Sequence, residues 1–449
     1  MNLRTFSRHL VAALCLFLLP LGLIGCAHET AAEHAANVYA SQELAAAPPH
    51  GNIPDYSLAP ADLAKAQHLG TVDEVLHFGD EAWGIVSLLL LLAFGIIARM
   101  RDTAINLSRS RWVQGYAFVF LFLLVTSLLN LPIDLYAHHL SLHYGLSVQS
   151  WPSWFADQGK TFGLTWFVGG LLVLLLFWII RKLPRTWWFA FWCAFIPILL
   201  FGIFVAPYIE PIFFHYQPLQ QTDPALVAQL EKVVEKGHMN IPPQRMFLMK
   251  ASAKFTTLNA DVEGFGASKR VVVWDTTIAK MTPDEIVFVF GHESGHYVLH
   301  HIASTIVFTL VLLFVCFYLG YRFVLWALAR FGDRWHISSQ NDWAALAILL
   351  LAFSLFGTLL EPIENSYSRM HEHAADVYGQ EAIHGLVPDP QSTAKNAFDV
   401  LGKTSFADPN PNPFYELWTY THPSIGRRAA FAEDYDPWAP GMQPKYFKK

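Results

Sequence analysis

The chain alternates long apolar segments with shorter polar ones. A membrane-spanning helix takes roughly 20 consecutive apolar residues, and six segments come close to that length. They are residues 82–98, 113–135, 162–180, 187–206, 303–328 and 343–360. This pattern predicts a mainly α-helical, multi-pass protein whose transmembrane helices form a bundle.

The composition supports a membrane protein. Of the 449 residues, 53% are hydrophobic, 15% are aromatic and 15% are charged, and the mean hydropathy is +0.32. Ordinary soluble enzymes are less apolar. The net charge of −6 argues against nucleic acid as a partner, so membrane lipid is the first partner that we expect. The four cysteines show no pattern of a disulfide framework or a thiolate metal site.

Basic residues are concentrated in three connections between the apolar segments. Successive crossings put all three connections on one side, which the positive-inside rule makes cytoplasmic. The connection 136–161 has only Lys160 and falls on the opposite side, as do 207–302 and everything after Leu360. We therefore predict a bacterial inner-membrane protein with these regions in the periplasm. The basic residues are Arg99, Arg101, Arg109 and Arg111, then Arg181, Lys182 and Arg185, then Arg322, Arg330 and Arg334.

The first 26 residues have the pattern of an export signal. Arg4 and Arg8 precede an apolar core, which ends in Leu-Ile-Gly-Cys at residues 23–26. This resembles a bacterial lipoprotein signal, in which the chain is cleaved before the cysteine and Cys26 is lipidated. An uncleaved first transmembrane helix is the alternative. Both interpretations predict that the segment after residue 26 is exported.

The segments divide the chain into six predicted parts. The largest polar insert has a helical pattern at Pro224 to Lys236 and strand patterns at Arg245 to Lys250 and Arg270 to Trp274, so we expect a small α/β portion at one membrane face. The parts are a signal-like or first membrane segment (1–26), an exported segment with a helix near residues 60–78 (27–81), four transmembrane helices (82–206), the α/β portion (207–302), two transmembrane helices (303–360) and a C-terminal portion (361–449).

The candidate chemistry lies in the stretch from Thr282 to His301. Its start predicts a helix, because Thr282 and Glu285 form a capping-box pattern around a proline at the first helical position. His292, Glu293 and His296 then follow in the HExxH arrangement. Helical spacing puts the two histidines one turn apart on one face, where both rings reach a single Zn²⁺ beside a glutamate that serves as general base. A chance match in a histidine-rich chain is the alternative.

The third ligand has to come from elsewhere in the chain. His300 lies roughly 12 Å from His292 if the helix continues. The two later spans return the chain to the same membrane face, so residues after Leu360 can meet the HExxH helix. There Glu372 and Asp376 lie one helical turn apart, which suits a carboxylate ligand and an acceptor for a ligand histidine. By position alone Glu361 and Glu364 remain rivals.

Several blocks of this sequence resemble the CAAX prenyl protease family of membrane-embedded zinc metalloendopeptidases. The three signature-like blocks are HESGH at 292–296, NSYSRMHEHAAD at 365–376 and THPSIGRR at 421–428. The likeness extends through residues 143–150, 206–219 and 256–278, and it covers most of the chain from about residue 80 onward. The resemblance implies a helical bundle that encloses a large chamber, with the metal site closing one end.

The resemblance also implies roles for individual residues. It makes His292, His296 and Glu372 the ligands of one Zn²⁺ per chain. Glu293 becomes the general base, and Asp376 becomes the group that orients a ligand.

Further roles concern the substrate and the transition state. The resemblance makes His422 a catalytic histidine that steadies the oxyanion of the tetrahedral intermediate. It places Asn259 and Ala260 on the strand that binds the peptide backbone. Arg428 is grouped with these substrate-binding residues, with its role left open.

These observations predict an integral-membrane zinc metalloendopeptidase that acts on a peptide or protein substrate. One alternative is a quality-control zinc protease of the bacterial inner membrane, from a related family with fewer spans and a cytoplasmic site. Another is a non-enzymatic transporter or sensor with a bound metal. Transporters keep ionisable residues near the bilayer midplane, whereas the segments 82–98 and 343–360 are nearly free of internal charge.

Overall fold

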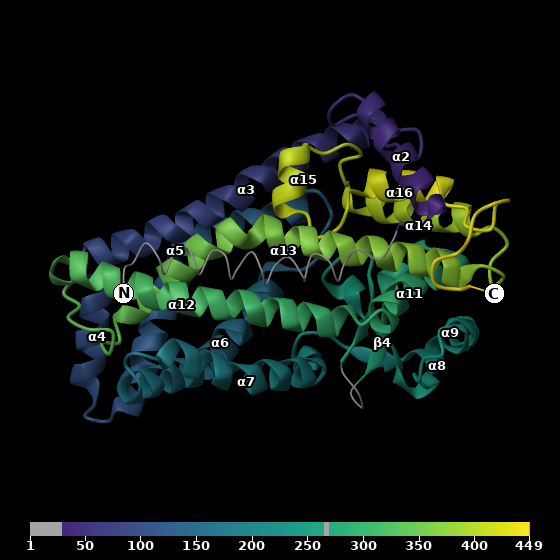
Figure 1. The fold of residues 1–449 in the computed structure, drawn as a ribbon. Coiled ribbons are helices and arrows are strands. Elements are labelled where there is room, and N and C mark those ends of the chain that lie inside the picture. Colours follow the sequence, from purple (N-terminus) through teal and green to yellow (C-terminus); the bar gives the residue numbers. More distant parts are fainter. Residues whose placement is uncertain (1–28, 265–268, 449) are drawn as a thin grey trace.

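The fold is dominated by long helices that run side by side (Figure 1). The computed structural model describes residues 29–264 and 269–448. Among these residues, six helices are long and apolar enough to cross a membrane, which confirms the six predicted spans. They are α3 (Pro60–Ala93), α5 (Arg111–His143), α6 (Trp151–Lys182), α7 (Trp187–Ile209), α12 (His301–Trp335) and α13 (Ala345–Ile383).

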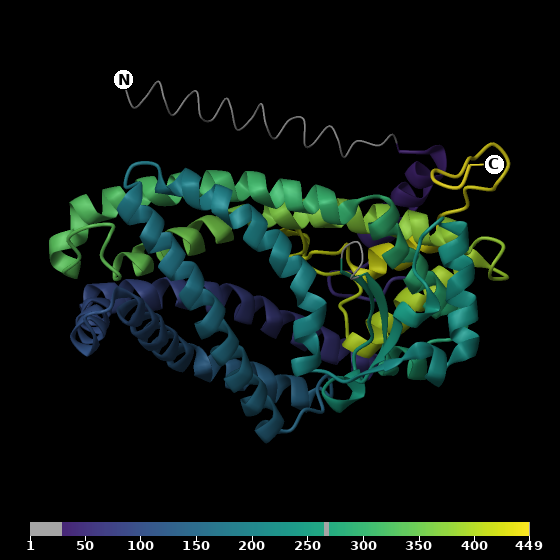
Figure 2. The same ribbon diagram turned by 90° about the horizontal axis from the view of Figure 1, so that it is seen from below.

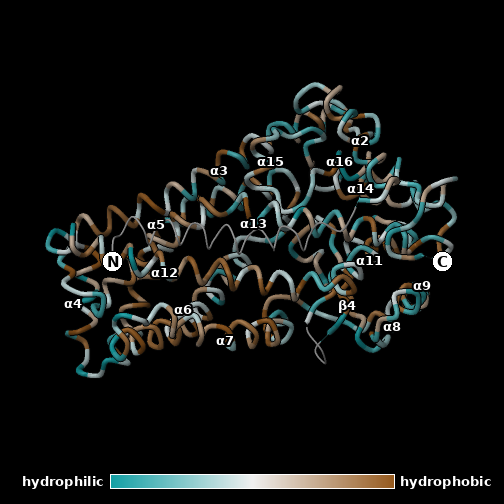
Figure 3. The backbone as a smooth tube through the Cα atoms, viewed as in Figure 1, coloured by the Kyte–Doolittle hydropathy of each residue, from teal (hydrophilic) through white to brown (hydrophobic). Residues whose placement is uncertain are grey.

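The six helices form an open bundle rather than a closely packed core. In their most apolar windows only 6% to 33% of the residues are buried within the protein, so most of this apolar surface faces lipid or an interior space. Figure 3 shows long apolar stretches along α5, α6, α7 and α12. The polar end carries the sheet and the shorter helices, and seen from below it lies at one end of the bundle (Figure 2).

The first span differs from the prediction. The expected helix near residues 60–78 and the apolar segment 82–98 belong to one continuous helix, α3, which ends at Ala93. The chain breaks at Gly95, whose φ of 65° is left-handed, and α4 (Ile96–Leu107) starts in a new direction. The hydropathy pattern does not reveal this break, because the residues on both sides of it are apolar. A helix that the sequence pattern did not predict, α2 (Ala31–Ala46), precedes α3 and has a complete capping box.

The small α/β portion contains a four-stranded sheet in the order β1-β2-β4-β3. β2 (Met246–Met249) pairs in parallel with β4 (Arg270–Trp274), while β1 (Tyr216–Pro218) and β3 (Ala260–Glu263) pair antiparallel at the two edges. Both strands that the pattern predicted are present. The outer side of β3 pairs with no other strand that the structure describes.

Short helices surround this sheet. The helix that the sequence predicted at residues 224–236 is α9. Most of the others are single turns. In chain order the short helices are η1 (Glu210–Ile212), α8 (Leu219–Thr222), α9 (Pro224–Lys236), η2 (Pro243–Arg245), η3 (Ala251–Ala253) and α10 (Asp275–Lys280).

The HExxH stretch forms helix α11 (Pro283–Val298), and its capping box is present as predicted: Thr282 and Glu285 exchange side-chain to backbone hydrogen bonds. The helix does not continue to His300, which has a left-handed backbone and precedes α12. The distance inferred for His300 from a continuous helix was therefore based on a wrong assumption.

The C-terminal part packs against α11 and α13. It contains α14 (Pro390–Ser405), α15 (Pro413–Thr419) and α16 (Ile425–Asp434). Buried side chains of α2, α9, α11, α14 and α16 join those of the sheet in one apolar core. This core holds the polar end of the protein together. The predicted signal and Cys26 lie outside the described residues.

Candidate metal centre and active site

Small residues bring helices α11 and α13 into backbone contact. A Cβ atom added to Gly379 would lie 2.7 Å from the backbone nitrogen of His292, and one added to Gly291 would lie 3.2 Å from the carbonyl oxygen of Gly379. Gly295 faces Ala375 in the same way, at 3.1 Å. Only glycine allows so close an approach. The contact sets the distance at which carboxylates on α13 reach histidines on α11.

Three donor groups converge between these two helices. His292 Nε2 lies 3.3 Å from Glu372 Oε2, and His296 Nε2 lies 3.4 Å from Glu372 Oε1. The two ring nitrogens are 3.1 Å apart. His292 and Glu372 are buried, and His296 is partly exposed. The structure therefore brings together all three residues that were predicted as ligands.

The spacing of these donors fits a metal ion. A tetrahedral Zn²⁺ with zinc to nitrogen bonds near 2.0 Å places two ligand atoms about 3.3 Å apart, close to the three separations above. Glu372 Oε2 is also buried, and although imidazole nitrogens lie near it, none of the described residues donates a well-aligned hydrogen bond to it. Two imidazoles and one carboxylate are the donor set of catalytic zinc sites that keep a fourth position for water. The residues present thus fit a divalent cation.

Asp376 and Arg428 support the histidine ligand from behind. His292 Nδ1 lies 2.7 Å from Asp376 Oδ1. Arg428 donates to both oxygens of the same carboxylate, from Nε at 2.9 Å and from Nη2 at 2.6 Å. All three side chains are buried. The guanidinium thereby fixes the carboxylate that orients the ring. The resemblance groups Arg428 with the substrate-binding residues. In the structure its Nε and Nη2 atoms donate to Asp376.

The charges around His292 favour positive charge at this position. Burial alone lowers the pKa of His292, but hydrogen bonds and negative charge from Asp376 and Glu372 outweigh burial and raise the pKa to about 10. A metal ligand must be neutral at the coordinating nitrogen, so a cation and a proton compete for the same place.

Glu293 lies beside the donors rather than among them. Its Oε1 is 3.9 Å from His292 Nε2. Burial raises the pKa of Glu293 to about 8, helped by the negative charges of Asp261 and Glu372 and opposed by His292 and Arg428. A carboxylate with a pKa raised toward neutrality can both accept and return a proton. A bound cation would oppose this shift by adding positive charge nearby.

His422 reaches the donors from the segment between α15 and α16. Its Nε2 lies 3.1 Å from Glu372 Oε2, and its Nδ1 lies 2.8 Å from the hydroxyl of Thr421. The ring opens onto a cavity, yet enough protein surrounds it to lower its pKa to about 4, with Arg428 and His292 adding to this effect and Glu372 opposing it. A neutral imidazole at this position can donate one hydrogen bond.

The predicted peptide-binding strand lies on the opposite wall. Asn259 comes directly before β3, and Ala260 is its first residue. The backbone of Asn259 is held by Thr277, whose hydroxyl accepts from the nitrogen at 2.9 Å and donates to the oxygen at 2.7 Å. Its side-chain amide donates to the Asp261 carboxylate at 3.0 Å. These bonds fix the strand next to the edge that remains open.

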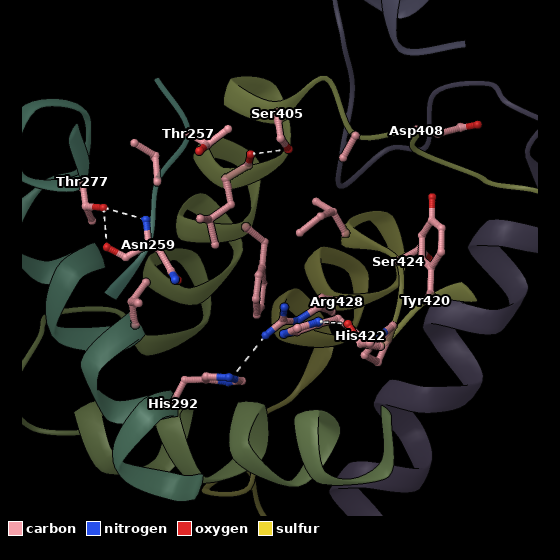
Figure 4. Close-up of a pocket in the computed structure, with 18 of the residues that line it drawn as sticks. Thr257, Asn259, Thr277, His292, Ser405, Asp408, Tyr420, His422, Ser424 and Arg428 are labelled. Atoms are coloured by element: carbon pink, nitrogen blue, oxygen red, sulfur yellow. Dashed lines mark hydrogen bonds between the residues drawn. The ribbon is translucent and has the colours of Figure 1, made fainter. Parts of the chain in front are cut away.

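A cavity of about 550 Å³ connects these groups. Figure 4 shows His292 between Asn259 and Thr277 on one side and His422 and Arg428 on the other. Apolar side chains form much of the rest of the lining, which suits an apolar peptide side chain. These lining residues are Leu258, Met281, Phe288, Val289, Phe398, Leu401, Pro423 and Ile425.

Two positioning residues were not identified from the sequence. Arg369 donates to the carbonyl oxygens of Glu416, Leu417 and Tyr420, so it fixes the end of α15 and the segment that carries His422. Its place three residues before Glu372 was the available signal, since it faces the same side of the helix.

The other is His301, whose Nδ1 lies 3.1 Å from Nδ1 of His296. Its ring stacks on His371 with a centroid distance of 4.1 Å. The break after α11 turns His301 back toward the ligand, and sequence spacing does not reveal this turn.

The two rivals for the third ligand lie elsewhere. Glu361 pairs with His77 of α3, with 3.1 Å between Oε1 and Nε2, and together with Glu81 it forms a separate group. Glu364 is not part of the group that converges on His292. The geometry therefore favours Glu372.

A bundle of apolar helices with a histidine and carboxylate centre at one end defines the class of membrane metallopeptidases. Two family models match this chain. The model for peptidase family M48 matches residues 220–436, and the model described as CAAX prenyl protease N-terminal, five membrane helices, matches residues 50–215. The chain belongs to peptidase family M48.

Individual relatives agree with this assignment. An uncharacterized metalloprotease, YhfN, from Bacillus subtilis is 30% identical over 84% of this chain and 86% of its own length. CAAX prenyl protease 1 from Saccharomyces cerevisiae is 24% identical over 78% of this chain and 81% of its own. The crystal structure of S. mikatae Ste24p has the same fold, with a TM-score of 0.74 and 20% identity over 93% of this chain and 98% of that one. The resemblance drawn from the sequence blocks is thereby confirmed.

Proposed function

We propose that this membrane metallopeptidase is a zinc endopeptidase whose ligands are His292, His296 and Glu372. The observation that carries the proposal is the convergence of these three donors, 3.1 to 3.4 Å apart, with Glu293 beside them. Zinc, when bound, acts as a Lewis acid toward the scissile carbonyl and acidifies a water molecule. Buried carboxylates carry a desolvation cost that a bound cation would offset, which supports a metal ion at this position.

The remaining residues have distinct roles in this proposal. Glu293 accepts the proton of the attacking water and then delivers it to the leaving amine. His422 is neutral near pH 7 because its pKa is lowered to about 4, so it donates a hydrogen bond to the oxyanion as it forms. Asp376 keeps His292 in the tautomer whose Nε2 is free to bind metal, and Arg428 keeps Asp376 in place.

The substrate is an extended peptide segment. The open edge of β3 provides backbone groups for a peptide strand, beginning at Ala260 after the fixed Asn259. The apolar lining of the cavity favours apolar side chains of exported or membrane proteins. Two of the relatives carry names that concern CAAX prenyl proteases or metalloproteases. Six spans and this fold favour the endopeptidase over the related quality-control proteases with fewer spans.

The orientation in the membrane is also part of the proposal. The three basic connections meet at the end of the bundle away from α11, through contacts of Arg101 with Asp342 and of Gln340 with Pro184. The positive-inside rule assigns this end to the cytoplasm, so the active site faces the periplasm. A reporter fused at Lys449 should be active only when exported, and a cytoplasmic reporter signal would contradict this orientation.

The chemistry is tested by cleavage of a random peptide library, which includes prenylated peptides, by purified protein with measured zinc content. We expect one zinc per chain and cleavage that a chelator abolishes. Glu293→Gln should lower the rate by at least about 100-fold while the zinc content is unchanged. A Glu293→Gln variant with the wild-type rate would overturn the proposed base. Zinc-loaded wild-type protein that cleaves no peptide would overturn the endopeptidase.

A further inference from the structure

Three connections meet at the end of the bundle that lies away from the active site (Figures 1 and 2). Arg101 of α4 pairs with Asp342 and donates to the carbonyl oxygen of His336 at 2.8 Å, which ties α4 to the connection between α12 and α13. Gln340 donates to the carbonyl oxygen of Pro184 at 2.7 Å and accepts from Trp187 Nε1 at 3.0 Å. These contacts build a fixed structure rather than three separate loops.

This structure contains an open cavity of about 600 Å³ that shares no lining residue with the catalytic cavity. Three arginines line it, and the acidic side chain among the lining residues is Asp342. The cavity therefore carries a net positive charge. The lining residues are Arg101, Ile105, Arg109, Arg111, Gln114, Ser338, Ser339, Asn341, Asp342 and Trp343.

Among the residues that the structure describes, two of the three arginines have no acidic partner. Arg101 is neutralised by Asp342 and also lies 2.8 Å from Asp102. Within the described ranges, no carboxylate pairs with Arg109 or Arg111, whereas Arg111 lies over the ring of Trp343 at 5.6 Å. Arg181 is close enough for its charge to act on Arg111. The side chains of Arg109 and Arg111 are thus free to bind an anion.

Polar atoms among the lining residues also lack partners. Trp343 is 1% exposed, and in the described part of the chain its Nε1 donor has no acceptor. The side-chain oxygen of Asn341 is likewise buried without a donor. Buried polar groups are normally hydrogen-bonded. A ligand with both an anionic oxygen and a hydroxyl group would satisfy the two atoms together.

The cavity lies where apolar helices begin. Arg111 is the first residue of α5, and the neighbouring Leu107 and Trp112 are 69% and 65% exposed. Tryptophan beside basic residues at the end of a span is typical of the interface between membrane and water. The ligand of this site is therefore expected to lie at the level of the lipid headgroups.

We propose that this cavity binds the phosphodiester headgroup of an anionic phospholipid, of the phosphoglycerol type. Arg109 and Arg111 hold the phosphate, because guanidinium groups match phosphate oxygens with paired hydrogen bonds. A glycerol hydroxyl of the headgroup donates to Asn341. The acyl chains lie along the exposed apolar side chains of α4 and α5. Basic pockets between spans on the cytoplasmic side are suited to such headgroups.

The experiment is native mass spectrometry of the full-length protein in detergent, titrated with phosphatidylglycerol or with phosphatidylcholine of the same acyl chains. Wild type should retain one phosphatidylglycerol per chain, at concentrations where phosphatidylcholine is lost. Arg109→Gln and Arg111→Gln should each weaken retention about 5-fold, and the double variant about 25-fold. Gel filtration reports whether each variant is folded.

The matched control is the double variant Arg185→Gln and Arg334→Gln. Arg185 lies in the connection between α6 and α7, and Arg334 lies in the last turn of α12 at the same end of the bundle. Both are exposed and do not line the cavity, so retention should stay within about 2-fold of wild type. Equal retention of the two lipids by wild type would overturn the proposal, and so would an equal loss in the control. Free glycerol phosphate that displaces the lipid at equal concentration would reassign the cavity to a soluble phosphate ester.

Discussion

The two ends of this protein gather side chains of opposite charge. At the catalytic end, three carboxylates, those of Glu293, Glu372 and Asp376, share one arginine, Arg428. At the other end, three arginines share the cavity with one aspartate. The catalytic end thus gathers mainly acidic side chains, and the other end gathers mainly basic ones. An excess of side chains of one charge indicates the sign of the ligand that will balance it.

The ends also differ in how their geometry is fixed. Direct backbone contact between α11 and α13 sets the positions of the catalytic donors. These positions therefore depend on the glycines at that contact. The arginines of the cavity at the other end lie on α4 (Arg101), in the connection before α5 (Arg109) and at the start of α5 (Arg111), and they have long, adaptable side chains. We therefore expect the catalytic end to be far more sensitive to small changes in volume.

The largest effect is expected for Gly379→Ala. Its new Cβ atom would lie 2.7 Å from the backbone of His292, and backbone cannot move aside without separating α11 from α13. Peptidase activity should fall at least about 100-fold, as a displacement near 1 Å can produce, and zinc content should drop. Gly357→Ala is the control, because this glycine lies on the same helix with nothing within 4 Å of the new atom. If both variants keep full activity, the helix contact does not set the site.

A second large effect is expected for Asp376→Asn. The change removes the negative charge that binds both His292 and the buried Arg428. Zinc affinity, measured by competition with a chelator, should fall about 10- to 100-fold. Asp399→Asn breaks a partly exposed pair with Lys403 away from the site and should leave the affinity unchanged. Equal zinc affinity in wild type and Asp376→Asn would contradict the orienting role.

A smaller effect concerns stability at the catalytic end. Burial raises the pKa of Glu43 from its ordinary 4.5 to about 7, with the Asp55 carboxylate adding to the shift. A carboxyl group with a raised pKa stabilises the fold when protonated, and this stability is lost as the pH rises from about 4.5 through about 7. Glu43→Gln should therefore match wild type at pH 4.5 and gain on the order of 2 kcal/mol at pH 8.

Thermal unfolding at the two pH values checks this, with a Tm gain of about 2 °C expected only at the higher one. A gain of the same size at both pH values would mean that ionisation of Glu43 is not the cause.

The smallest effect is expected for His301→Gln. His292 is oriented by a charged carboxylate, whereas His296 is contacted by another imidazole at 3.1 Å. A neutral partner contributes less to ligand basicity, so zinc affinity should fall only about 5-fold. The same chelator competition measures it. A loss as large as that of Asp376→Asn would show that the two ligands are supported equally.

Much of this site could be predicted because its parts follow local rules. The capping box of Thr282 and Glu285, the one-turn spacing of His292 and His296, and the spacing of Glu372 and Asp376 each depend on neighbours within one or two helical turns. The structure shows these local features as predicted. The roles of the residues, and zinc as the metal, stay predictions that chelator competition and the peptide library test.

The features that sequence did not reveal depend on distant contacts or on backbone turns. Arg369 acts on carbonyl groups about 50 residues further along the chain. His301 meets His296 because α11 ends before it. Helix α3 ends at Ala93, just before the break at Gly95, within an apolar run that shows no change in hydropathy. Helix α2 has mostly small side chains, whose burial pattern gives a weak periodic signal.

The open edge of β3 has a consequence for what the protein can act on. Elsewhere an exposed strand edge invites aggregation, but here a strand of four residues, Ala260–Glu263, comes directly after the residues that line an internal cavity. A helix or a folded sheet already uses its own backbone groups and cannot pair with it. In the proposed function, β3 therefore selects substrates by conformation before sequence: a segment is cut only after it has lost, or before it has gained, its own local structure.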